Sequence, residues 1–300
     1  LIIFSMDSLS EGLRHFLPLA TSFLVTVLLL PVIRGLAVWS GCVSLPSTQR
    51  WHKQPIPYLG GVAIFLGFLL PALFFSPSPL SLFPLFLVAS QMFILGTYDD
   101  LRRINPATKL VGQIIAAATA IFYGYSLNFF GWPLLDLLLT ALWIIGLTNA
   151  LNLLDNMDGL AGGIGLIAAL FLAFFFQQAG DLQHALIALA LAGAVGGFLL
   201  FNFHPASIFM GDAGSLFLGA TLSLLAIKAH GQVSSILSLV AVPALILLVP
   251  ILDTILVSVT RLMRGQPVSQ GGKDHFSHRL VLLGLSEPKA VLLLYAMAAV

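Results

Sequence analysis

The chain contains a series of apolar runs, each long enough to cross the hydrocarbon core of a lipid bilayer, which is roughly 30 Å thick. We place them at residues 15–38, 59–75, 80–98, 109–127, 131–151, 159–177, 184–201, 213–229 and 234–260, and a further run that starts near 288 is cut off at 300. Breakers such as Gly131-Trp132-Pro133 separate the runs. The pattern predicts an all-α, polytopic integral membrane bundle of about ten transmembrane helices.

The composition agrees with a membrane protein, because 59% of the residues are hydrophobic and only 8% are charged. A soluble chain of this length could not bury so much apolar surface. We therefore expect residues 1–300 to form a single transmembrane domain whose last helix is truncated at 300, in a chain that looks like a trimmed fragment. The lone Cys42 excludes an internal disulfide and a cysteine-based zinc site. A net charge of +1 says little about partners, and no nucleic-acid partner is predicted.

The basic residues are distributed asymmetrically over the connections between the apolar runs. Of the thirteen Lys and Arg, only Arg14 and Lys228 belong to even-numbered connections or to the N-terminal side. The others belong to odd-numbered connections and their flanks: Arg34, Arg50, Lys53, Arg102, Arg103, Lys109, Arg261, Arg264, Lys273, Arg279 and Lys289. Cytoplasmic loops are enriched in Lys and Arg, so we predict that the odd-numbered connections are cytoplasmic and the N-terminus lies outside.

Most acidic residues fall on the same predicted side as the basic residues. They are Asp99, Asp100, Asp155, Asp158, Asp212, Asp253, Asp274 and Glu287. Acidic residues have no topological preference comparable to that of Lys and Arg. Their clustering therefore has another cause, and a shared functional site explains it.

The first candidate is the pair Asp99-Asp100 at the end of the third apolar run. Adjacent carboxylates at a membrane boundary repel each other unless a cation or a proton lies between them. An alternative is a helix end whose acids pair with Arg102 and Arg103.

The second candidate is a set of polar residues spaced by three, which are Asn149, Asn152, Asp155 and Asp158. This spacing predicts one slowly drifting polar stripe along a membrane helix. Polar groups on such a face are costly unless they meet a partner or a ligand. A purely structural, hydrogen-bonded stripe is the alternative.

The third candidate is the segment from Asn202 to Ser215, which contains Gly211-Asp212. Glycines beside an aspartate near a helix start let the backbone approach an anion or a metal closely. Asp212 could equally cap the eighth helix, and Asn202 could be only a helix-end cap.

Further candidates lie in two other predicted cytoplasmic segments. His275, His278 and Arg279 form a weak metal motif but suit phosphate or sugar binding, with a solvated loop as the alternative. Lys53 and Lys109 could bind phosphates or serve only as topology charges. Carboxylates that hold Mg²⁺, combined with these polar and basic groups, favour phosphoryl transfer. No Walker loop, dinucleotide fingerprint or Ser-His-Asp arrangement points to other chemistry.

The motifs resemble those of the polyprenyl-phosphate N-acetylhexosamine-1-phosphate transferases, the MraY/WecA/TagO superfamily or glycosyltransferase family 4. The resemblance runs from Lys53 to about residue 285. It rests on five motifs: Lys53 with Gly60-Gly61; Asp99-Asp100 followed by Lys109-Leu110-Val111-Gly112-Gln113; Asn149, Asn152, Asp155 and Asp158-Gly159-Leu160; Asn202, Pro205 and Phe209-Met210-Gly211-Asp212-Ala213-Gly214-Ser215; and His275 with His278.

The resemblance implies a bundle of ten or eleven helices with a cytoplasm-facing active-site cleft in the inner membrane. It implies transfer of a sugar 1-phosphate from a UDP-N-acetylhexosamine to polyprenyl (undecaprenyl) phosphate, with release of UMP and formation of the lipid-linked diphospho-sugar that initiates cell-envelope polysaccharide synthesis. Mg²⁺, or alternatively Mn²⁺, is the implied cofactor. Membrane lipid surrounds the protein, and a homodimer is one of the oligomeric states left open.

The resemblance also assigns roles by position. We expect four aspartates to be catalytic: Asp99, Asp100, Asp155 and Asp212. Asp212 would bind Mg²⁺ directly with Asp99 and Asp100 nearby, and one of that pair would activate the lipid phosphate, in a one-step or a two-step mechanism. The expected substrate-binding residues are Lys53, Lys109, Asn149, Asn152, Asp158, Asn202, His275, His278 and Arg279. Of these, Lys53 and Lys109 would hold phosphates, and His275, His278 and Arg279 would contact the sugar phosphate side. Asn152 and Asn202, together with Asp155, would face the nucleotide and its diphosphate.

The branch of the superfamily is read from the last loop. Members that load N-acetylmuramoyl-pentapeptide carry three consecutive histidines there, which this chain lacks. The N-acetylglucosamine branch usually shows His-x-His-His, and here Ser277 stands at the third position. We favour the N-acetylglucosamine branch, with the pentapeptide branch as the alternative. Asp253 looks like part of this branch's pattern, or it could simply pair with an arginine.

Two hypotheses outside this enzyme class stay open. In an ion-coupled transporter, the acids would lie near the bilayer midplane, often in two related halves. Here the acids gather at one interface and no repeat is visible, which disfavours a transporter. A catalytically silent scaffold is the third reading, and the intact motif set disfavours it.

Overall fold

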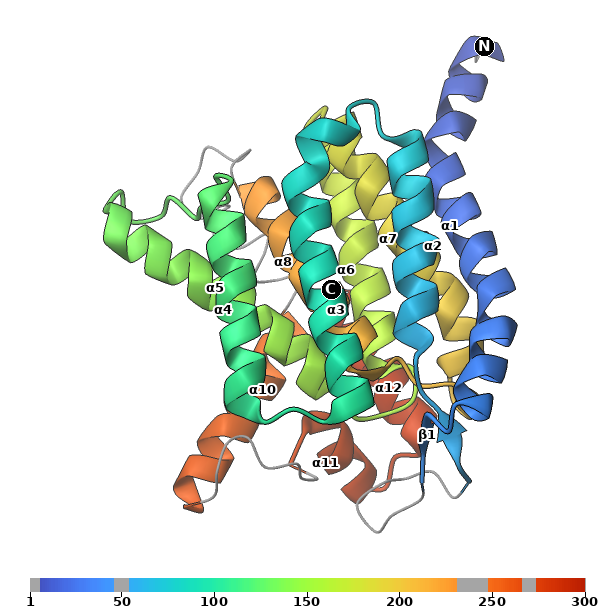
Figure 1. Ribbon diagram of the computed structural model, residues 1–300, viewed down its shortest axis with the longest axis vertical. Helices are drawn as coiled ribbons and strands as arrows, with labels where there is room; N and C mark the ends of the chain where they lie inside the picture. Colours follow the sequence, from blue (N-terminus) through green and yellow to red (C-terminus); the bar gives the residue numbers. More distant parts are fainter. Residues whose placement is uncertain (1–5, 46–53, 231–247, 266–273, 300) are drawn as a thin grey trace.

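A computed structural model describes residues 6–45, 54–230, 248–265 and 274–299, with side chains from residue 16 onward (Figure 1). The fold is almost entirely helical. Its helices are α1 (Met6–Trp39), α2 (Gly60–Phe75), a short 3₁₀ helix (Pro79–Leu82), α3 (Phe83–Arg102), α4 (Pro106–Phe122), α5 (Pro133–Leu154), α6 (Leu160–Gln178), α7 (Leu182–Asn202), α8 (Gly211–His230), α10 (Leu248–Met263), α11 (Phe276–Leu282) and α12 (Glu287–Ala298). Two short antiparallel strands, β1 (Val43–Ser44) and β2 (Ile56–Pro57), lie between α1 and α2.

The predicted polytopic helical membrane protein is confirmed, whereas the number of spans stays a prediction. Among the described residues, six helices are long and apolar enough to cross a membrane: α1, α3 with the preceding 3₁₀ turn, α5, α6, α7 and α8. Helices α2 and α4 are apolar but have only 16 and 17 residues. The predicted run 234–260 lies partly in 231–247, outside the described residues.

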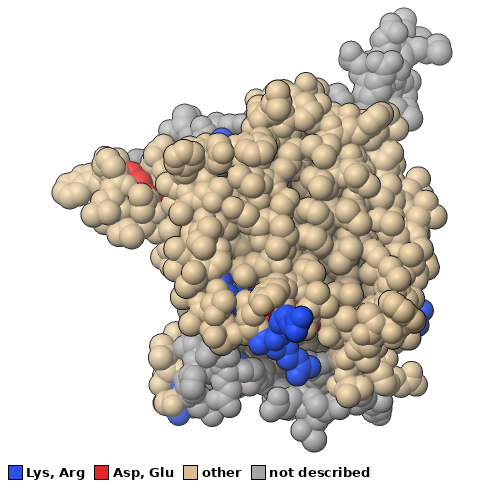
Figure 2. Space-filling view, in the orientation of Figure 1, with Lys and Arg blue, Asp and Glu red and all other residues tan. Residues whose placement is uncertain are grey.

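The strand pair, the α3–α4 connection and α11 lie together at the lower end of the bundle, and the described N-terminus lies at the opposite end (Figure 1). All three belong to odd-numbered connections of the chain. The fold therefore brings to one end the segments that carry most of the Lys and Arg residues. On the visible face, Lys and Arg side chains gather toward the same lower end, while most of the surface above them is uncharged (Figure 2).

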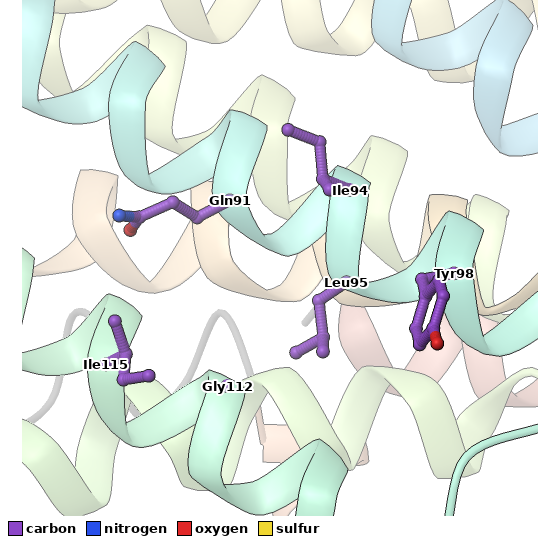
Figure 3. Close-up of a pocket in the computed structure, with 6 residues that line it drawn as sticks. All are labelled: Gln91, Ile94, Leu95, Tyr98, Gly112 and Ile115. Carbon is purple, nitrogen blue, oxygen red and sulfur yellow. The ribbon is translucent and has the colours of Figure 1, made fainter.

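A shallow groove of about 330 Å³ lies between α3 and α4 (Figure 3). Its lining is mostly apolar and comes from Gln91, Ile94, Leu95, Tyr98, Gly112 and Ile115. A Cβ atom at Gly112 would lie 2.7 Å from a methyl group of Leu95, so this glycine permits the close approach of the two helices. None of the site residues predicted from the sequence lines this groove, although Tyr98 immediately precedes Asp99.

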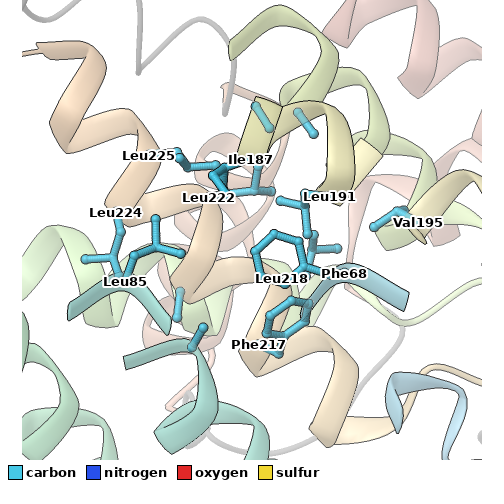
Figure 4. Close-up of a cluster of buried hydrophobic side chains, with 14 of the residues drawn as sticks. Phe68, Leu85, Ile187, Leu191, Val195, Phe217, Leu218, Leu222, Leu224 and Leu225 are labelled. Atoms are coloured by element: carbon cyan, nitrogen blue, oxygen red, sulfur yellow. The ribbon is translucent and has the colours of Figure 1, made fainter. Parts of the chain in front are cut away.

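Helix α8 is the core of the bundle and packs against α2, α3, α5 and α6. Its side chains are almost all buried, and they are mostly small or aliphatic. Without a strong hydrophobic drive between helices in lipid, small residues permit the close packing that holds them together. Around it lie Phe68 from α2, Leu85 from α3 and Leu191 from α7 (Figure 4). The ring of Phe217 on α8 lies 5.4 Å from that of Phe68.

Helix α1 lies at the edge of the bundle and packs along α7 and α2. Gly193 of α7 faces the backbone of Leu19, where a Cβ atom would collide with the carbonyl oxygen. The outer stripe of α1 is exposed, with Leu24, Leu28 and Leu36 between 56% and 72% accessible. Such an exposed leucine stripe is expected of a helix that faces lipid.

The segment before α8 is fixed to the entrance of α2 by backbone hydrogen bonds. The N–H of Gly60 donates to the carbonyl of Phe209 at 2.9 Å, and the N–H of Gly61 donates to that of Met210 at 2.8 Å. The N–H of Phe209 donates in turn to the carbonyl of Pro57 at 2.9 Å. These bonds hold the N-terminus of α8 at the lower end of the bundle, next to the end of α3.

Candidate active site

Lys109 is the centre of the polar cluster at the lower end of the bundle. It lies in the first turn of α4, where Pro106 is the first residue and the Asn105 side chain caps the helix by accepting from the N–H of Thr108 at 2.8 Å. The Nζ atom of Lys109 lies 2.9 Å from Oδ2 of Asp99 and 2.8 Å from Oδ2 of Asp212. One ammonium group therefore joins the C-terminus of α3 to the N-terminus of α8.

Asn152 brings α5 into the same cluster. Its Nδ2 atom donates to Oδ1 of Asp212 at 2.6 Å and to the hydroxyl of Ser215 at 2.8 Å. Its Oδ1 atom accepts from Nζ of Lys109 at 3.5 Å. Each carboxylate oxygen of Asp212 thus has a different donor, and four helices contribute side chains to one small volume. Ser215 was not among the predicted site residues, although it follows Asp212 by about one helical turn.

Asp100 caps helix α8 from a different helix. Its carboxylate accepts from the backbone N–H groups of Asp212 and Ala213, both at 2.9 Å. Gly211 makes this approach possible, because it has a φ of +74° and a Cβ atom there would lie 2.7 Å from Oδ2 of Asp100. The alternative in which Asp212 caps α8 is therefore wrong, since the cap is Asp100 and the Asp212 carboxylate faces Lys109 and Asn152.

Asp99 is 9% exposed and lies beside the loop between α3 and α4. Its Oδ1 atom accepts from the N–H of Ile104 at 2.9 Å, which leaves Oδ2 for Lys109. The alternative that pairs this acid with Arg102 or Arg103 is wrong for Asp99, because its cationic partner is Lys109 and both arginines are exposed.

Asp155 and Asp158 do not continue a helical stripe, because α5 ends at Leu154 and both residues lie in the turn that follows. Burial raises the pKa of Asp155 to about 7, and three neighbouring acids add to the shift, namely Asp212, Asp100 and Asp158. These neighbouring acids disfavour the ionised form of Asp155, and a further cation at the cluster would favour it.

The donor set fits a divalent cation of the magnesium type. Mg²⁺ prefers oxygen ligands and is usually bound by one or two carboxylates together with substrate phosphates. In this structure the ammonium group of Lys109 lies between Asp99 and Asp212 as a stand-in cation. Among the described residues, no three or more acidic, histidine or cysteine side chains already surround one point as metal ligands. A cation at Asp212 would therefore share these carboxylates with Lys109 or displace its ammonium group.

Three of the predicted site residues stabilise the surroundings of the cluster instead of facing its centre. Asn149 forms a reciprocal amide pair with Gln113 of α4, at 2.8 and 3.1 Å. Asn202 is 2% exposed, accepts from the N–H of Gly159 at 3.0 Å and donates to the carbonyl of Ile208 at 3.0 Å.

The third of these residues is Asp158, which holds the segment after α7. Its Oδ2 atom accepts from the N–H of Ala206 at 3.0 Å and lies 3.2 Å from Nδ1 of His204. Together with Asn202, this contact fixes the chain between α7 and α8.

The last candidate segment is held to α10, and at these residues it is a helix and not a loop, because His275 is the N-cap of α11 and His278 and Arg279 lie within α11. Nδ1 of His275 lies 2.7 Å from Oδ2 of Asp253, so the alternative that pairs Asp253 with an arginine is wrong. Nε of Arg279 donates to the carbonyl of Asp274 at 3.0 Å. Ser277 donates to Oδ1 of Asn156 at 2.7 Å, which connects this segment to the turn that contains Asp155. Asn156 was not predicted as a site residue, and its place next to Asp155 is the only signal.

His278 is buried, and its ring centroid lies 5.8 Å from that of His275. Both rings therefore belong to one buried element beside the turn after α5. Lys53 lies outside the described residues.

Comparison with known proteins agrees with the motifs. The family model "Glycosyl transferase family 4" matches residues 82–230, which contain Asp99, Lys109, Asn152 and Asp212. A probable undecaprenyl-phosphate N-acetylglucosaminyl 1-phosphate transferase of Bacillus subtilis is 33% identical, over 94% of this chain and 82% of the relative.

Two further relatives extend the comparison. A decaprenyl-phosphate N-acetylglucosaminephosphotransferase of Mycolicibacterium smegmatis is 34% identical, over 92% of this chain and 77% of the relative. A phospho-N-acetylmuramoyl-pentapeptide-transferase of Halalkalibacterium halodurans is 31% identical, over 95% of this chain and 96% of the relative. The chain therefore belongs to glycosyl transferase family 4, within the polyprenyl-phosphate N-acetylhexosamine-1-phosphate transferase superfamily that its motifs resemble.

Proposed function

We propose that the protein transfers N-acetylglucosamine 1-phosphate, or a related N-acetylhexosamine 1-phosphate, from a UDP-sugar to undecaprenyl phosphate. In the net reaction, a phosphate oxygen of the lipid forms a bond to the β-phosphorus of the UDP-sugar. The bond between this phosphorus and the oxygen of the α-phosphate breaks, and UMP leaves. The product is a lipid-linked diphospho-sugar, which initiates cell-envelope polysaccharide synthesis.

The observation that carries this proposal is the meeting of Asp99, Lys109 and Asp212 at the ends of membrane helices. Phosphoryl transfer depends mainly on positioning and on neutralising negative charge, which this combination of acids and a cation can provide. Two relatives that the chain matches over most of its length are named as N-acetylglucosamine phosphate transferases acting on polyprenyl phosphates.

Within the cluster, Asp212 is our candidate for the main Mg²⁺ ligand, with Asp99 beside it. Bound Mg²⁺ would neutralise charge on the diphosphate of the donor and make its β-phosphorus more electrophilic. Lys109 would bind a phosphate oxygen once the metal ion takes over the charge of Asp212. Asn152 would keep the Asp212 carboxylate in one orientation through its 2.6 Å hydrogen bond.

Between the two adjacent aspartates, we assign activation of the lipid phosphate to Asp99. Both carboxylate oxygens of Asp100 accept backbone N–H groups of α8, so this residue is engaged in holding Asp212. In Asp99, Oδ1 accepts from the backbone N–H of Ile104, whereas Oδ2 contacts only the side chain of Lys109. A lysine side chain can move away from this oxygen more easily than a backbone N–H can. Asp99 would take the proton of the lipid phosphate, and Asp155 would add negative charge that favours metal binding.

Substrate binding is assigned to the surrounding polar groups. Lys53 would hold a phosphate, and Asn202 and Asp158 would shape the wall toward the nucleotide. His275 at the start of α11, with His278 and Arg279 within it, would contact the sugar phosphate. We favour N-acetylglucosamine over N-acetylmuramoyl-pentapeptide because this segment lacks three consecutive histidines. Asn149 would support the site through Gln113.

We place the site on the cytoplasmic side of the inner membrane, with the N-terminus outside. The proposal is supported by the eleven of thirteen Lys and Arg that belong to odd-numbered connections. A soluble UDP-sugar and a membrane-held phosphate could meet at such an interface.

The test is UMP release by purified protein in detergent or nanodiscs with undecaprenyl phosphate and Mg²⁺. A panel of UDP-N-acetylglucosamine, UDP-N-acetylgalactosamine and UDP-N-acetylmuramoyl-pentapeptide would identify the donor. We expect UMP release with UDP-N-acetylglucosamine and formation of a lipid diphospho-sugar. Absence of UMP with every donor would refute the proposed reaction, and turnover only with the pentapeptide donor would overturn the choice of branch.

A further inference from the structure

Asp253 is a buried acid outside the Lys109 cluster. It lies in α10 and is 1% exposed, and His275, which precedes α11, is 4% exposed. Oδ2 of Asp253 lies 2.7 Å from Nδ1 of His275, and Oδ1 accepts from the N–H of Phe276 at 2.7 Å. Both oxygens of the carboxylate are therefore used by two consecutive residues at the start of α11, the N-cap His275 and the first helical residue Phe276.

This geometry decides which nitrogen of the imidazole carries a proton. An ionised carboxylate only accepts hydrogen bonds, so Nδ1 of His275 must be the donor. A buried carboxylate is costly unless it is paired and hydrogen-bonded, so the contact is strongly favoured over an unpaired Asp253. Nε2 is then the ring nitrogen that is left to bind another group.

The neighbouring contacts hold His275 next to the candidate active site. Ser277 binds Asn156 at 2.7 Å, in the turn that also contains Asp155. Asp274 is bound by Nε of Arg261 at 3.1 Å and by Nη1 of Arg264 at 3.3 Å. Arg261 of α10 and Arg264 just after it therefore hold the residue before His275 through its side chain. Among the hydrogen bonds formed by the described residues, Asp253 alone contacts the imidazole.

We propose that Asp253 is a positioning residue, which fixes the orientation and tautomer of His275 so that Nε2 contacts the sugar phosphate of the donor. The proposal rests on the proposed function, because His275 has a substrate only if the site binds a UDP-sugar. Partners that orient a metal-ligating histidine through its other nitrogen typically contribute roughly 10- to 100-fold to its function, and we expect an effect of the same order for a histidine that binds phosphate. Asp253 would act only through His275.

The central variant is Asp253→Asn. Its carbonyl oxygen can still accept from Phe276, but its amide group donates to Nδ1 of His275 and moves the ring proton to Nε2. We expect kcat for UMP release to fall by roughly 10- to 100-fold, with a small change in thermal stability. In a His275→Gln background, the same substitution should have no further effect on kcat. If the losses multiply in the double variant, Asp253 does not act through His275 and the proposal is wrong.

Asp274→Asn is the matched control, because it loosens the same segment without touching the imidazole. It should lower kcat by the same factor in the wild-type and His275→Gln backgrounds. If Asp253→Asn does not fold, Asp253→Glu keeps the charge and is expected to recover part of the activity. A rate equal to that of wild type in Asp253→Asn would also overturn the proposal.

A spectroscopic measurement separates this inference from the proposed function. In protein with ¹⁵N-labelled histidine, the signal absent from His275→Gln identifies His275 among the seven histidines. We expect a protonated Nδ1 in wild type and an unprotonated Nδ1 in Asp253→Asn. A wild-type Nδ1 without a proton would refute the inference even in an active enzyme. An inactive wild type with the expected Nδ1 signal would refute the proposed function but not the contact.

Discussion

The ammonium group of Lys109 lies 2.8 Å from the carboxylate of Asp212, although 103 positions separate the two residues in the sequence. The same nitrogen lies 2.9 Å from Asp99. Lys109 thus balances part of the negative charge that the proposed metal ion would balance in the working enzyme. Substitution of Lys109 therefore tests whether its charge is needed for activity.

We expect Lys109→Met to lower kcat/KM for UMP release by roughly 10²- to 10³-fold, because a preorganised charge at a phosphoryl group is lost. Lys109→Arg keeps the charge and should retain more activity than Lys109→Met. Lys228→Met is the matched control, since Lys228 lies over the ring of Tyr125, 4.4 Å from its centroid and away from the cluster. A normal rate in Lys109→Met would contradict the assignment of Lys109 to the phosphates.

The adjacent aspartates should respond differently to removal of their side chains. Asp100→Ala deletes the cap of α8 and should lower both activity and stability, the latter by about 1 kcal/mol. Asp99→Asn should abolish activity with little loss of stability, because only one of its contacts is to backbone. Thermal unfolding combined with UMP release separates the two effects.

The control for Asp100→Ala is Asp181→Ala. Asp181 caps α7 by accepting from the N–H of His184 at 3.1 Å, away from the Lys109 cluster. Its removal should reduce stability by a similar amount while activity stays close to wild type. Equal stability of Asp99→Asn and Asp100→Ala would argue against the cap.

The amide pair of Asn149 and Gln113 predicts a coupling between α4 and α5. Asn149→Leu leaves the buried amide of Gln113 without this partner and should destabilise the protein by roughly 1–3 kcal/mol. Gln113→Leu should destabilise it less, because the half-buried Asn149 amide still donates to the carbonyl of Ile145 at 2.8 Å. The double variant removes both amides and should be less destabilised than the sum of the two single variants. Urea or thermal unfolding of the four proteins measures the coupling, and strict additivity would show that the pair does not form.

Metal dependence gives a prediction that does not rely on turnover alone. Chelation should stop UMP release, and added Mg²⁺ should restore it. A ligand that binds the native state raises its stability, so Mg²⁺ should raise the Tm of the wild type. In Asp212→Asn this increase in Tm should be absent or much smaller. An unchanged increase would mean that the ion binds elsewhere.

The pKa of Asp155, raised from 3.8 to about 7, predicts a pH-dependent stability in metal-free protein. The native carboxyl group holds its proton more tightly than the unfolded one. Its contribution is therefore fully present below pH about 4 and is lost as the pH rises to about 7. Asp155→Asn removes this contribution. The Tm of the variant minus the Tm of the wild type should therefore become more positive as the pH rises from about 4 to about 7. A difference independent of pH would contradict the raised pKa.

Much of the fold and of the cluster could be predicted from the sequence, for identifiable reasons. Apolar runs fix the helices, since only a helix satisfies its backbone within lipid. The distribution of Lys and Arg predicted that the helix ends with Asp99, Lys109 and Asp212 lie on one side of the membrane. In the structure, Lys109 contacts both aspartates.

The spacing of three at Asn149, Asn152, Asp155 and Asp158 predicted one polar face, and this was only partly right. Each step of three residues turns the side chain by about 60° around the helix axis. Asn149 therefore points to Gln113 on α4, whereas Asn152 points to Asp212 on α8. The end of α5 at Leu154 then removes the last two residues from the helix.

Contacts between distant segments could not be predicted from local patterns. Nothing in the neighbourhood of Asp100 indicates that its partners are the backbone N–H groups of Asp212 and Ala213. Asp253 likewise precedes its partner His275 by 22 positions, with arginines at nearer positions that seemed equally suitable by charge. Only the packing of α10 against the rest of the bundle decides between them.

The cap that Asp100 provides for α8 also has a consequence for biogenesis. Asp100 and Asp212 are 112 positions apart, so a nascent chain has inserted several helices before the partner of this carboxylate is synthesised. Until α8 arrives, an acid at the end of α3 has no backbone N–H groups to bind, and Lys109 has no Asp212. A polypeptide that stops before Gly211 would leave the Asp100 carboxylate without the N–H groups of α8 and Lys109 without Asp212.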